Sequence, residues 1–172
     1  MQVQRGFRTK LEDYLDTKQR LTVDLGIQGR AVYDFSCFGV DDHNKLSDDR
    51  YMIFYNQRQS PNKEIEVSLQ NGRALYTIDL VQLPYSVNKL VFTVSIDGDG
   101  VMSGIDKQTV SLMQNNQSIL SCEYLGKDFF LEKAVIALEI YRKGAWRVNF
   151  VGQGFRGGLS ELLGHFGGQE LK

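Results

Sequence analysis

The sequence predicts an all-β protein: a β-sandwich of about nine or ten mostly antiparallel strands with a short C-terminal helix. Three observations lead to this prediction. Apolar and polar residues alternate in short blocks along most of the chain, turn-forming residues separate the blocks, and helical patterns are scarce. Short alternating strands with turns between them are typical of sandwiches and barrels.

The individual strands follow from this alternation. The alternating blocks predict strands at 21–27, 33–37, 65–69, 74–80, 90–96, 110–112, 120–124 and 146–151. The polar tract at 115–117 between two of them predicts a hairpin turn. Two blocks, 51–55 and 134–141, are apolar without alternation, which predicts strands in the middle of a sheet, covered on both faces.

Two segments show a helical pattern. In the segment 159–166 the apolar residues fall on one face of a two-turn helix, and residues 7–15 are a second candidate for a short helix. Nothing along the chain indicates a domain boundary, so we expect one domain over residues 1–172. A chain of this length buries roughly 70% of its unfolded surface, enough for a core without metal or disulfide cross-links.

Composition and charge exclude several classes of protein. The chain has 20 Lys and Arg against 21 Asp and Glu, and this balance argues against a nucleic-acid binder that works through a strong basic field. The N-terminus is charged throughout, with no apolar signal-peptide core, and the run Ala134–Leu138 is much shorter than the roughly 20 residues that span a bilayer. Cys37 and Cys122 are isolated, which favours a reduced, cytoplasmic protein with two buried thiols over a single disulfide.

Two short motifs resemble ligand-binding sequences. Residues 152–157 match GxGxxG, but only 15 residues follow Gly157, too few for the second strand and acidic residue of a dinucleotide site. We expect these glycines to provide a positive-φ exit from the last strand. Residues 97–100 (DGDG) resemble the start of an EF-hand loop, but position twelve is Gln108 instead of Glu. A solvated hairpin loop is the better interpretation.

Catalytic patterns are weak, and we expect no enzyme activity. The chain has two histidines, His43 and His165, and contains none of the sequence signatures GxSxG, HExxH or HxE…CxxC. Glu139 interrupts an apolar block, and because a buried carboxylate is costly unless it is paired, we expect Arg142 or Arg147 beside it, or a position at the rim. The acidic stretch 41–49 indicates either a solvated loop or hard-cation ligands.

The C-terminal run Leu138–Gly167 resembles the signature of the TerD family of tellurium-resistance and stress proteins. The matching residues are Glu139, Tyr141, Arg142, Trp146, Gly152, Gln153, Gly154, Phe155, Gly157, Gly158 and Leu159. Upstream, 33–38, 46–65 and 83–92 are similar to further family segments, so the resemblance covers nearly the whole chain. It implies a β-sandwich, in agreement with the strand pattern.

The resemblance also implies Ca²⁺ binding through a D-L-D strand and a long acidic loop, and this chain departs from both. Val32 stands at the first acidic position, so that only Asp34 is retained, and the acidic loop after Val67 is shortened, without its carboxylates. Since Ca²⁺ takes six to eight oxygen ligands, we expect no high-affinity site. For any metal that does bind, we predict Asp34 together with Asp48 or Asp49 as ligands.

These features give a leading functional hypothesis and two alternatives. The leading one is a non-enzymatic cytoplasmic binding module that acts through other stress or tellurite-resistance proteins, without nucleic acid, and meets a membrane only through a partner. The first alternative is a small-ligand receptor, such as the cyclic-nucleotide binders described among relatives, with Arg156 as the candidate phosphate contact. The second is a redox or oxyanion role for Cys37 and Cys122. The oligomeric state stays open.

Overall fold

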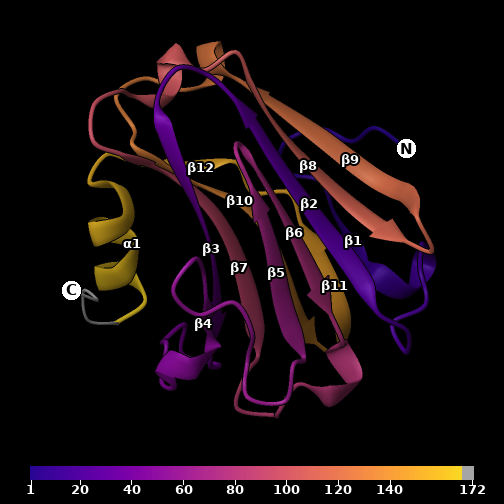
Figure 1. Cartoon of the computed structure of the whole chain (residues 1–172). Helices are drawn as coiled ribbons and strands as arrows, with labels where there is room; N and C mark the ends of the chain where they lie inside the picture. The colour runs from indigo at the N-terminus through magenta and orange to yellow at the C-terminus, as the bar shows by residue number, and fades with distance from the viewer. Residues whose placement is uncertain (168–172) are drawn as a thin grey trace.

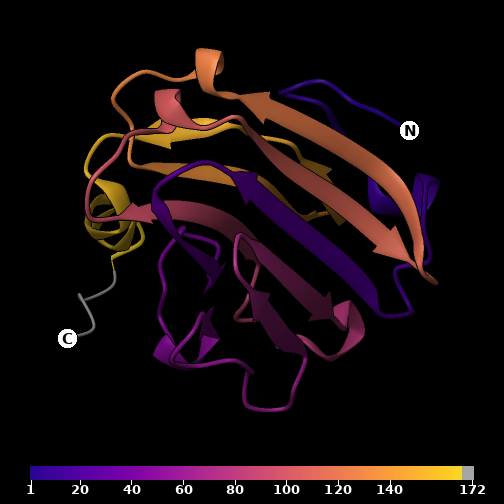
Figure 2. The same ribbon diagram turned by 45° about the horizontal axis from the view of Figure 1, so that its top comes forward.

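The computed structural model describes residues 1–167, which form two packed antiparallel β-sheets and one α-helix. Figures 1 and 2 show the two layers, with helix α1 (Gly158–His165) against one side of the molecule. This arrangement confirms the predicted all-β fold with a short C-terminal helix. Within residues 1–167 no helix is long and apolar enough to cross a membrane.

The larger sheet has seven strands in the order β1-β11-β10-β7-β3-β4, with β12 also paired to β10. Its strands are β1 (Arg8–Lys10), β3 (Val32–Val40), β4 (Met52–Ile53), β7 (Lys89–Asp97), β10 (Ala134–Lys143), β11 (Ala145–Asn149) and β12 (Gln153–Phe155). Strand β10 lies inside the sheet, as its apolar sequence predicts, because β7 covers one edge and β11 and β12 share the other.

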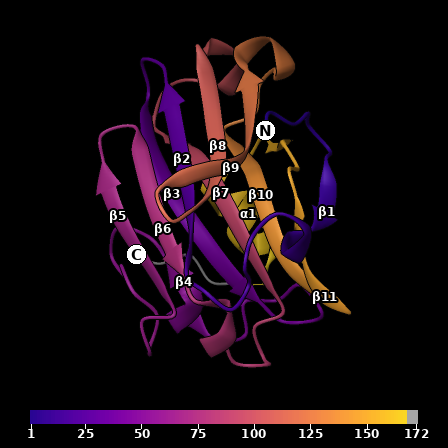
Figure 3. The ribbon, with the colours of Figure 1, turned by 90° about the vertical axis from the view of Figure 1, so that its right-hand side faces the viewer.

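The smaller sheet has five strands in the order β5-β6-β2-β8-β9. They are β2 (Leu21–Gln28), β5 (Ile65–Gln70), β6 (Arg73–Ile78), β8 (Lys107–Gln114) and β9 (Gln117–Leu125). The side view in Figure 3 shows this sheet with β5 at one edge and β9 at the other. The predicted β8–β9 hairpin is confirmed, with Asn115 and Asn116 at φ +54° and +62° in its turn.

The main core lies between the two sheets, and alternation decides which residues enter it. In β2, Leu21, Val23 and Leu25 are almost fully buried, while their neighbours Thr22 and Asp24 face outward and are half-buried. A second apolar cluster lies on the outer face of the larger sheet, where Leu162, Leu163 and Phe166 cover Phe38 and Val91. Each fully buried aliphatic or Phe side chain contributes about 1.5–3 kcal/mol.

Both open sides of the sandwich are closed by polar contacts. On one side, Gln2 of the N-terminal segment forms a β-bridge with Ser121 of β9. Further along the same segment, Gly6 N donates a hydrogen bond to the carbonyl of Phe150, just after β11. On the other side, Tyr76 Oη of the smaller sheet donates to the carbonyl of Ile53 in β4 of the larger one, at 3.0 Å. These contacts join the two sheets at their edges.

Three local predictions were wrong. Residues 8–10 form the short strand β1, followed by a 3₁₀ turn at Leu11–Asp13, because they pair with β11. The apolar block 51–55 holds the two-residue edge strand β4, buried on both faces because it closes a side of the sandwich. The loop after Asp97 is not a hairpin, since β7 and β8 belong to different sheets and the loop crosses between them.

The glycine-rich segment and Glu139 are also placed by the structure. Residues 153–155 of the GxGxxG match form β12, antiparallel to β10, and Gly152 and Gly158 on either side take φ of +64° and +67°, as the positive-φ exit requires. Glu139 pairs with Lys89 at 3.9 Å rather than with either predicted arginine, because Lys89 lies on the neighbouring strand β7.

Candidate functional site

The predicted metal ligand Asp34 lies near the start of β3, on the outer face of the larger sheet. It is opposite Ser95 and diagonal to Asp97 of β7. Burial raises the pKa of Asp34, and the nearby Asp97 carboxylate raises it further. Val32 stands where the resemblance implies the first acid of a D-L-D strand, and its side chain is exposed. Asp34 is therefore a partly buried carboxyl whose surroundings favour its protonated form.

Asp48 and Asp49 lie in the loop that leads into β4. Asp48 caps the 3₁₀ turn at Asp49–Tyr51 through a hydrogen bond from Arg50 N. The Asp48 carboxylate also accepts bonds from Arg50 Nε at 3.0 Å and Nη2 at 2.7 Å. The hydrogen-bonded Arg50 side chain lowers the pKa of Asp48, against a smaller effect of burial. Its oxygens are thus engaged by a guanidinium rather than open to a cation.

The structure does not bring Asp34 together with these two residues. Phe38, near the C-terminal end of β3, pairs with Met52, so Asp48 and Asp49 lie beyond this end of the strand. Asp34 lies four residues before Phe38, towards the other end. Along a strand that separation is about 13 Å. Among residues 1–167, no cluster of three or more His, Cys, Asp or Glu side chains has a geometry suited to a metal ion. The choice of these ligands stays a prediction.

Where the resemblance implies a long acidic loop, the structure has a tight turn. Strand β5 ends at Gln70 and β6 begins at Arg73, so only Asn71 and Gly72 connect them. Gly72 has φ +74°, which suits a two-residue hairpin turn. Neither residue carries a charged ligand for a cation.

The two thiols are placed deep in the sandwich. Cys37 and Cys122 are both free and buried between the sheets. Burial raises the pKa of the Cys37 thiol well above its ordinary value and also raises that of Cys122. A protonated, inaccessible thiol is a poor nucleophile.

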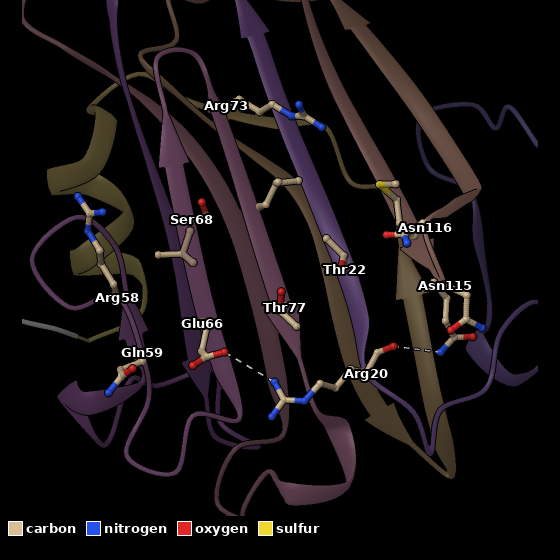
Figure 4. Close-up of a pocket in the computed structure, with 14 residues that line it drawn as sticks. Arg20, Thr22, Arg58, Gln59, Glu66, Ser68, Arg73, Thr77, Asn115 and Asn116 are labelled. Atoms are coloured by element: carbon tan, nitrogen blue, oxygen red, sulfur yellow. Dashed lines mark hydrogen bonds and ion pairs between the residues drawn. The ribbon is translucent and has the colours of Figure 1, made fainter.

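A hollow lies on the outer face of the smaller sheet, and we call it the polar groove. It has a volume of about 730 Å³. Figure 4 shows its lining side chains, which come from β5, β6, β2, the β8–β9 turn and the segment before β5. They include Arg20, Thr22, Arg58, Gln59, Glu66, Ser68, Arg73, Thr77, Asn115 and Asn116.

Strand pairing sets the order of these side chains. One row across the sheet runs Glu66, Thr77, Thr22 and Met113, because these residues are directly opposite one another on successive strands. Opposite residues of an antiparallel pair share a face, with Cβ atoms about 5 Å apart. The next row runs Ser68, Leu75, Asp24 and Ser111. The floor thus mixes short hydroxyl side chains with the apolar side chains of Leu75 and Met113.

The rim carries an excess of positive charge. Arg73 makes a two-point contact with Asp24, with Nη2–Oδ2 at 2.7 Å and Nε–Oδ1 at 3.1 Å. Arg20 lies 3.7 Å from Glu66, and both side chains are partly exposed to solvent, so this pair contributes at most about 1 kcal/mol. Arg58 donates only to the Tyr55 carbonyl and makes no ion pair within the described chain. The groove therefore offers guanidinium donors to a polar or acidic group.

Sequence reasoning did not identify the polar groove, although the signal was present. The outward-facing members of the alternating strands are Thr, Ser and charged residues in register, and three arginines follow or precede those strands. Their convergence depends on which strands are neighbours. Arg156, the predicted phosphate contact, is exposed in the turn between β12 and α1, away from the groove.

Known proteins resemble this chain along most of its length. A family model described as the TerD domain matches residues 1–166. The sequence is 34% identical over 119 residues to the tellurium resistance protein TerA of an Alcaligenes species, covering 67% of this chain and 34% of that protein. It is 26% identical over 184 residues to the tellurium resistance protein TerD of Serratia marcescens, covering 95% of each. The chain thus spans about a third of TerA and nearly all of TerD.

Another relative and a solved structure extend the comparison. The chemical-damaging agent resistance protein B of Clostridium acetobutylicum is 38% identical over 97 residues, covering 52% of this chain and 69% of that protein. The crystal structure of a homologue of telluride resistance protein (TerD) from Streptomyces coelicolor A3(2) has a TM-score of 0.64 at 17% identity, over 84% of this chain and 94% of that one. With the motif, the sandwich and the family model in agreement, the chain belongs to the TerD family.

Proposed function

We propose that this chain is a non-enzymatic binding module of a tellurium- and stress-resistance system in the cytoplasm, and that a partner protein docks on the polar groove. The names of its relatives, which record resistance to tellurium and to chemical-damaging agents, support the role in resistance. The partner we expect is another protein of the same resistance system.

The observation that supports docking on the groove is its open, polar and positively charged surface. A small-molecule site generally encloses its ligand with mostly apolar walls, whereas most of the side chains that line this groove are polar or charged. Arginine is enriched at the energetic centres of protein interfaces. Arg58, which has no ion-pair partner within residues 1–167, is the residue we expect to gain most from an acidic group of the partner.

The positions of the histidines support a role without catalysis. The hydroxyl groups of Thr22, Ser68 and Thr77 line the groove, but His43 belongs to the loop after β3 and His165 to α1. A hydroxyl nucleophile requires an adjacent base. Neither histidine lines the groove, and the lining carboxylate Glu66 pairs with Arg20. Turnover that is abolished by Asp34→Ala or Cys37→Ala would contradict this part of the proposal.

The test is a pull-down from the native host, with and without Ca²⁺, followed by titration of the purified partner. The variant Arg58→Glu reverses the charge at the rim of the groove, and Arg30→Glu, exposed in the β2–β3 turn, is the matched control. We expect the groove variant to weaken the partner's Kd by about tenfold or more and the control to leave it unchanged. A groove variant that binds as wild type would refute the docking site.

A small anionic ligand in the groove is the second candidate function. The observation that favours it is the lining itself, where Arg20 and Arg73 pair with Glu66 and Asp24, and Arg58 makes no ion pair within residues 1–167. A ligand that prefers the native state raises the melting temperature. Thermal-shift measurements with cyclic and linear nucleotides separate the two candidates, because stabilisation that Arg58→Gln removes requires a small ligand.

A further inference from the structure

A second charged surface lies on the opposite sheet, on the part of its outer face that α1 leaves open. Strand register places Lys10, Arg147, Tyr141 and Lys89 in one row across β1, β11, β10 and β7. The adjacent row contains Val91, which packs in the apolar cluster beneath α1, so both rows are on the outer face. We call this surface, formed by Arg8, Lys10, Lys89, Lys143 and Arg147 around Tyr141, the basic face.

The basic face has far more positive than negative charge. Glu139 is the one carboxylate in the two rows, and it pairs with Lys89 at 3.9 Å. The remaining four cations make no ion pair within the described residues. In a chain with a net charge of only −1, this is a concentrated field of one sign.

Part of this arrangement costs stability in the free protein. Lys10 and Arg147 are directly opposite in the β1–β11 pair, and like charges in opposite positions of a sheet repel. The Arg147 side chain is held by a bond from Nε to the Lys143 carbonyl at 3.0 Å, so the guanidinium stays over the sheet. An anion between the two cations would turn this repulsion into attraction.

The cations surround a hollow of a size that suits a ligand. Arg8, Thr9, Tyr141, Lys143, Gly144 and Arg147 line a space of about 600 Å³, and no carboxylate is among them. Tyr141 is half-buried at the floor, with Lys89 Nζ 5.9 Å from its ring centroid. Guanidinium and ammonium groups that converge without a competing carboxylate are the donors that recognise phosphate oxygens.

We propose that this hollow binds a ligand that carries two or more phosphate charges. Arg147 and Arg8 donate to phosphate oxygens, Lys143 and Lys10 add charge, and Tyr141 forms the floor. The same chemistry is available from a soluble phosphorylated compound and from the headgroups of an anionic membrane. This site lies on the opposite sheet from the polar groove, and the inference does not depend on the proposed partner there.

The experiment has two arms. Inorganic tripolyphosphate, titrated calorimetrically at low salt, tests the soluble source, and co-sedimentation with phosphatidylglycerol vesicles against phosphatidylcholine vesicles tests the lipid source. The site variant is Arg8→Gln with Lys143→Gln, and the control is Arg30→Gln with Lys127→Gln, which removes the same charge from exposed positions elsewhere. All four side chains are exposed, so the variants should keep the fold, which circular dichroism checks.

We expect binding in at least one arm, weakened about tenfold or more by the site variant and less than threefold by the control. Binding should also decline steeply with added salt, and tripolyphosphate should raise the melting temperature of the wild type more than that of the site variant. No binding in either arm, or equal losses for site and control variants, would overturn the proposal. The groove variant Arg58→Glu leaves the basic face intact, so the two proposals fail separately.

Discussion

The Tyr51 hydroxyl donates a hydrogen bond of 2.8 Å to the buried carboxylate of Glu64. The same carboxylate accepts bonds from the Ser60 hydroxyl and from Asn62 N, and Ile65 N donates in turn to the Ser60 hydroxyl. Burial by itself would raise the pKa of Glu64. The hydrogen bonds together lower it by more, so that its pKa lies below the ordinary value. A buried charge is thereby satisfied where the loop before β5 joins the two sheets.

Removing this carboxylate should be strongly destabilising. Glu64→Ala removes the acceptor of the Tyr51 and Ser60 hydroxyls in the interior, and we expect a loss of about 2–4 kcal/mol in the free energy of unfolding, measured with urea. Glu66→Ala is the control: its side chain is partly exposed and pairs with Arg20 at 3.7 Å, so its removal should cost less than about 1 kcal/mol. Equal effects of the two substitutions would contradict a special role for Glu64.

The lowered pKa of Glu64 also predicts the direction of a pH effect. Because the folded state holds this carboxylate charged, its stabilisation is present above the ordinary glutamate pKa and is lost as pH falls through the lower folded value. Glu64→Gln should therefore be less stable than wild type at neutral pH, and the gap should narrow in acid. If the difference in the free energy of unfolding between Glu64→Gln and wild type stays constant as pH falls, the ionisation of Glu64 is not its cause.

Asp34 should behave in the opposite sense. Burial and Asp97 raise the pKa of Asp34 in the folded state above its value in the unfolded state. The free energy of unfolding should therefore fall as pH rises from the ordinary aspartate pKa through the higher pKa of the folded state. We expect Asp34→Asn to raise the melting temperature at neutral pH and to have little effect in strong acid. Asp99→Asn, in the exposed loop beyond β7, should change the melting temperature less. A lower melting temperature for Asp34→Asn at neutral pH would disprove this assignment.

Arg142 of the family signature should be a stability residue that lysine does not replace. Its guanidinium carbon lies 4.5 Å from the Trp146 ring centroid and 5.0 Å from that of Tyr85, and Nη2 donates to the Val87 carbonyl at 3.2 Å. A lysine ammonium cannot stack as a plane between two rings. We expect Arg142→Lys to lower the free energy of unfolding by about 1–3 kcal/mol. Tyr85→Phe keeps the ring and should be close to neutral.

Gly152 should tolerate alanine much less well than Gly6, although both have positive φ. A Cβ at Gly152 would lie 2.8 Å from Tyr124 Cε1, in the buried core, whereas a Cβ at Gly6 meets nothing within 4 Å. We expect Gly6→Ala to cost about 1–2 kcal/mol from the backbone alone. Overpacking should add about 1–3 kcal/mol for Gly152→Ala. Similar melting temperatures for the two variants would refute this explanation of the Gly-Gln-Gly motif.

Calcium binding should be weak. Val32 and the two-residue Asn71–Gly72 turn lack carboxylate ligands where the family resemblance implies them, and Asp48, a further predicted ligand, is engaged by Arg50. We expect calorimetric titration with Ca²⁺ to show no sub-micromolar affinity. The heat of Ca²⁺ binding measured for Asp34→Asn should differ little from that of the wild type. A sub-micromolar Kd that Asp34→Asn abolishes would show that the family site persists.

The sequence by itself determined the strands and the family. In β2 and β5 alternation is a local property of the backbone, because successive side chains point to opposite faces wherever a strand lies. The same reasoning placed α1 and the Asn115–Asn116 turn. It failed at residues 8–10 and at 51–55, where a partner strand or the side of the sandwich decided the conformation.

Only the tertiary structure decided which surfaces exist. Arg58, Glu66 and Arg20 meet in the polar groove because β5, β6 and β2 are neighbours, and Lys10 meets Arg147 because β1 pairs with a strand about 140 residues later. Period-two alternation tells which residues face outward but not which strands lie side by side. Strand order is fixed by the packing of two whole sheets around one core, and for that reason neither charged surface could be read from spacing along the chain.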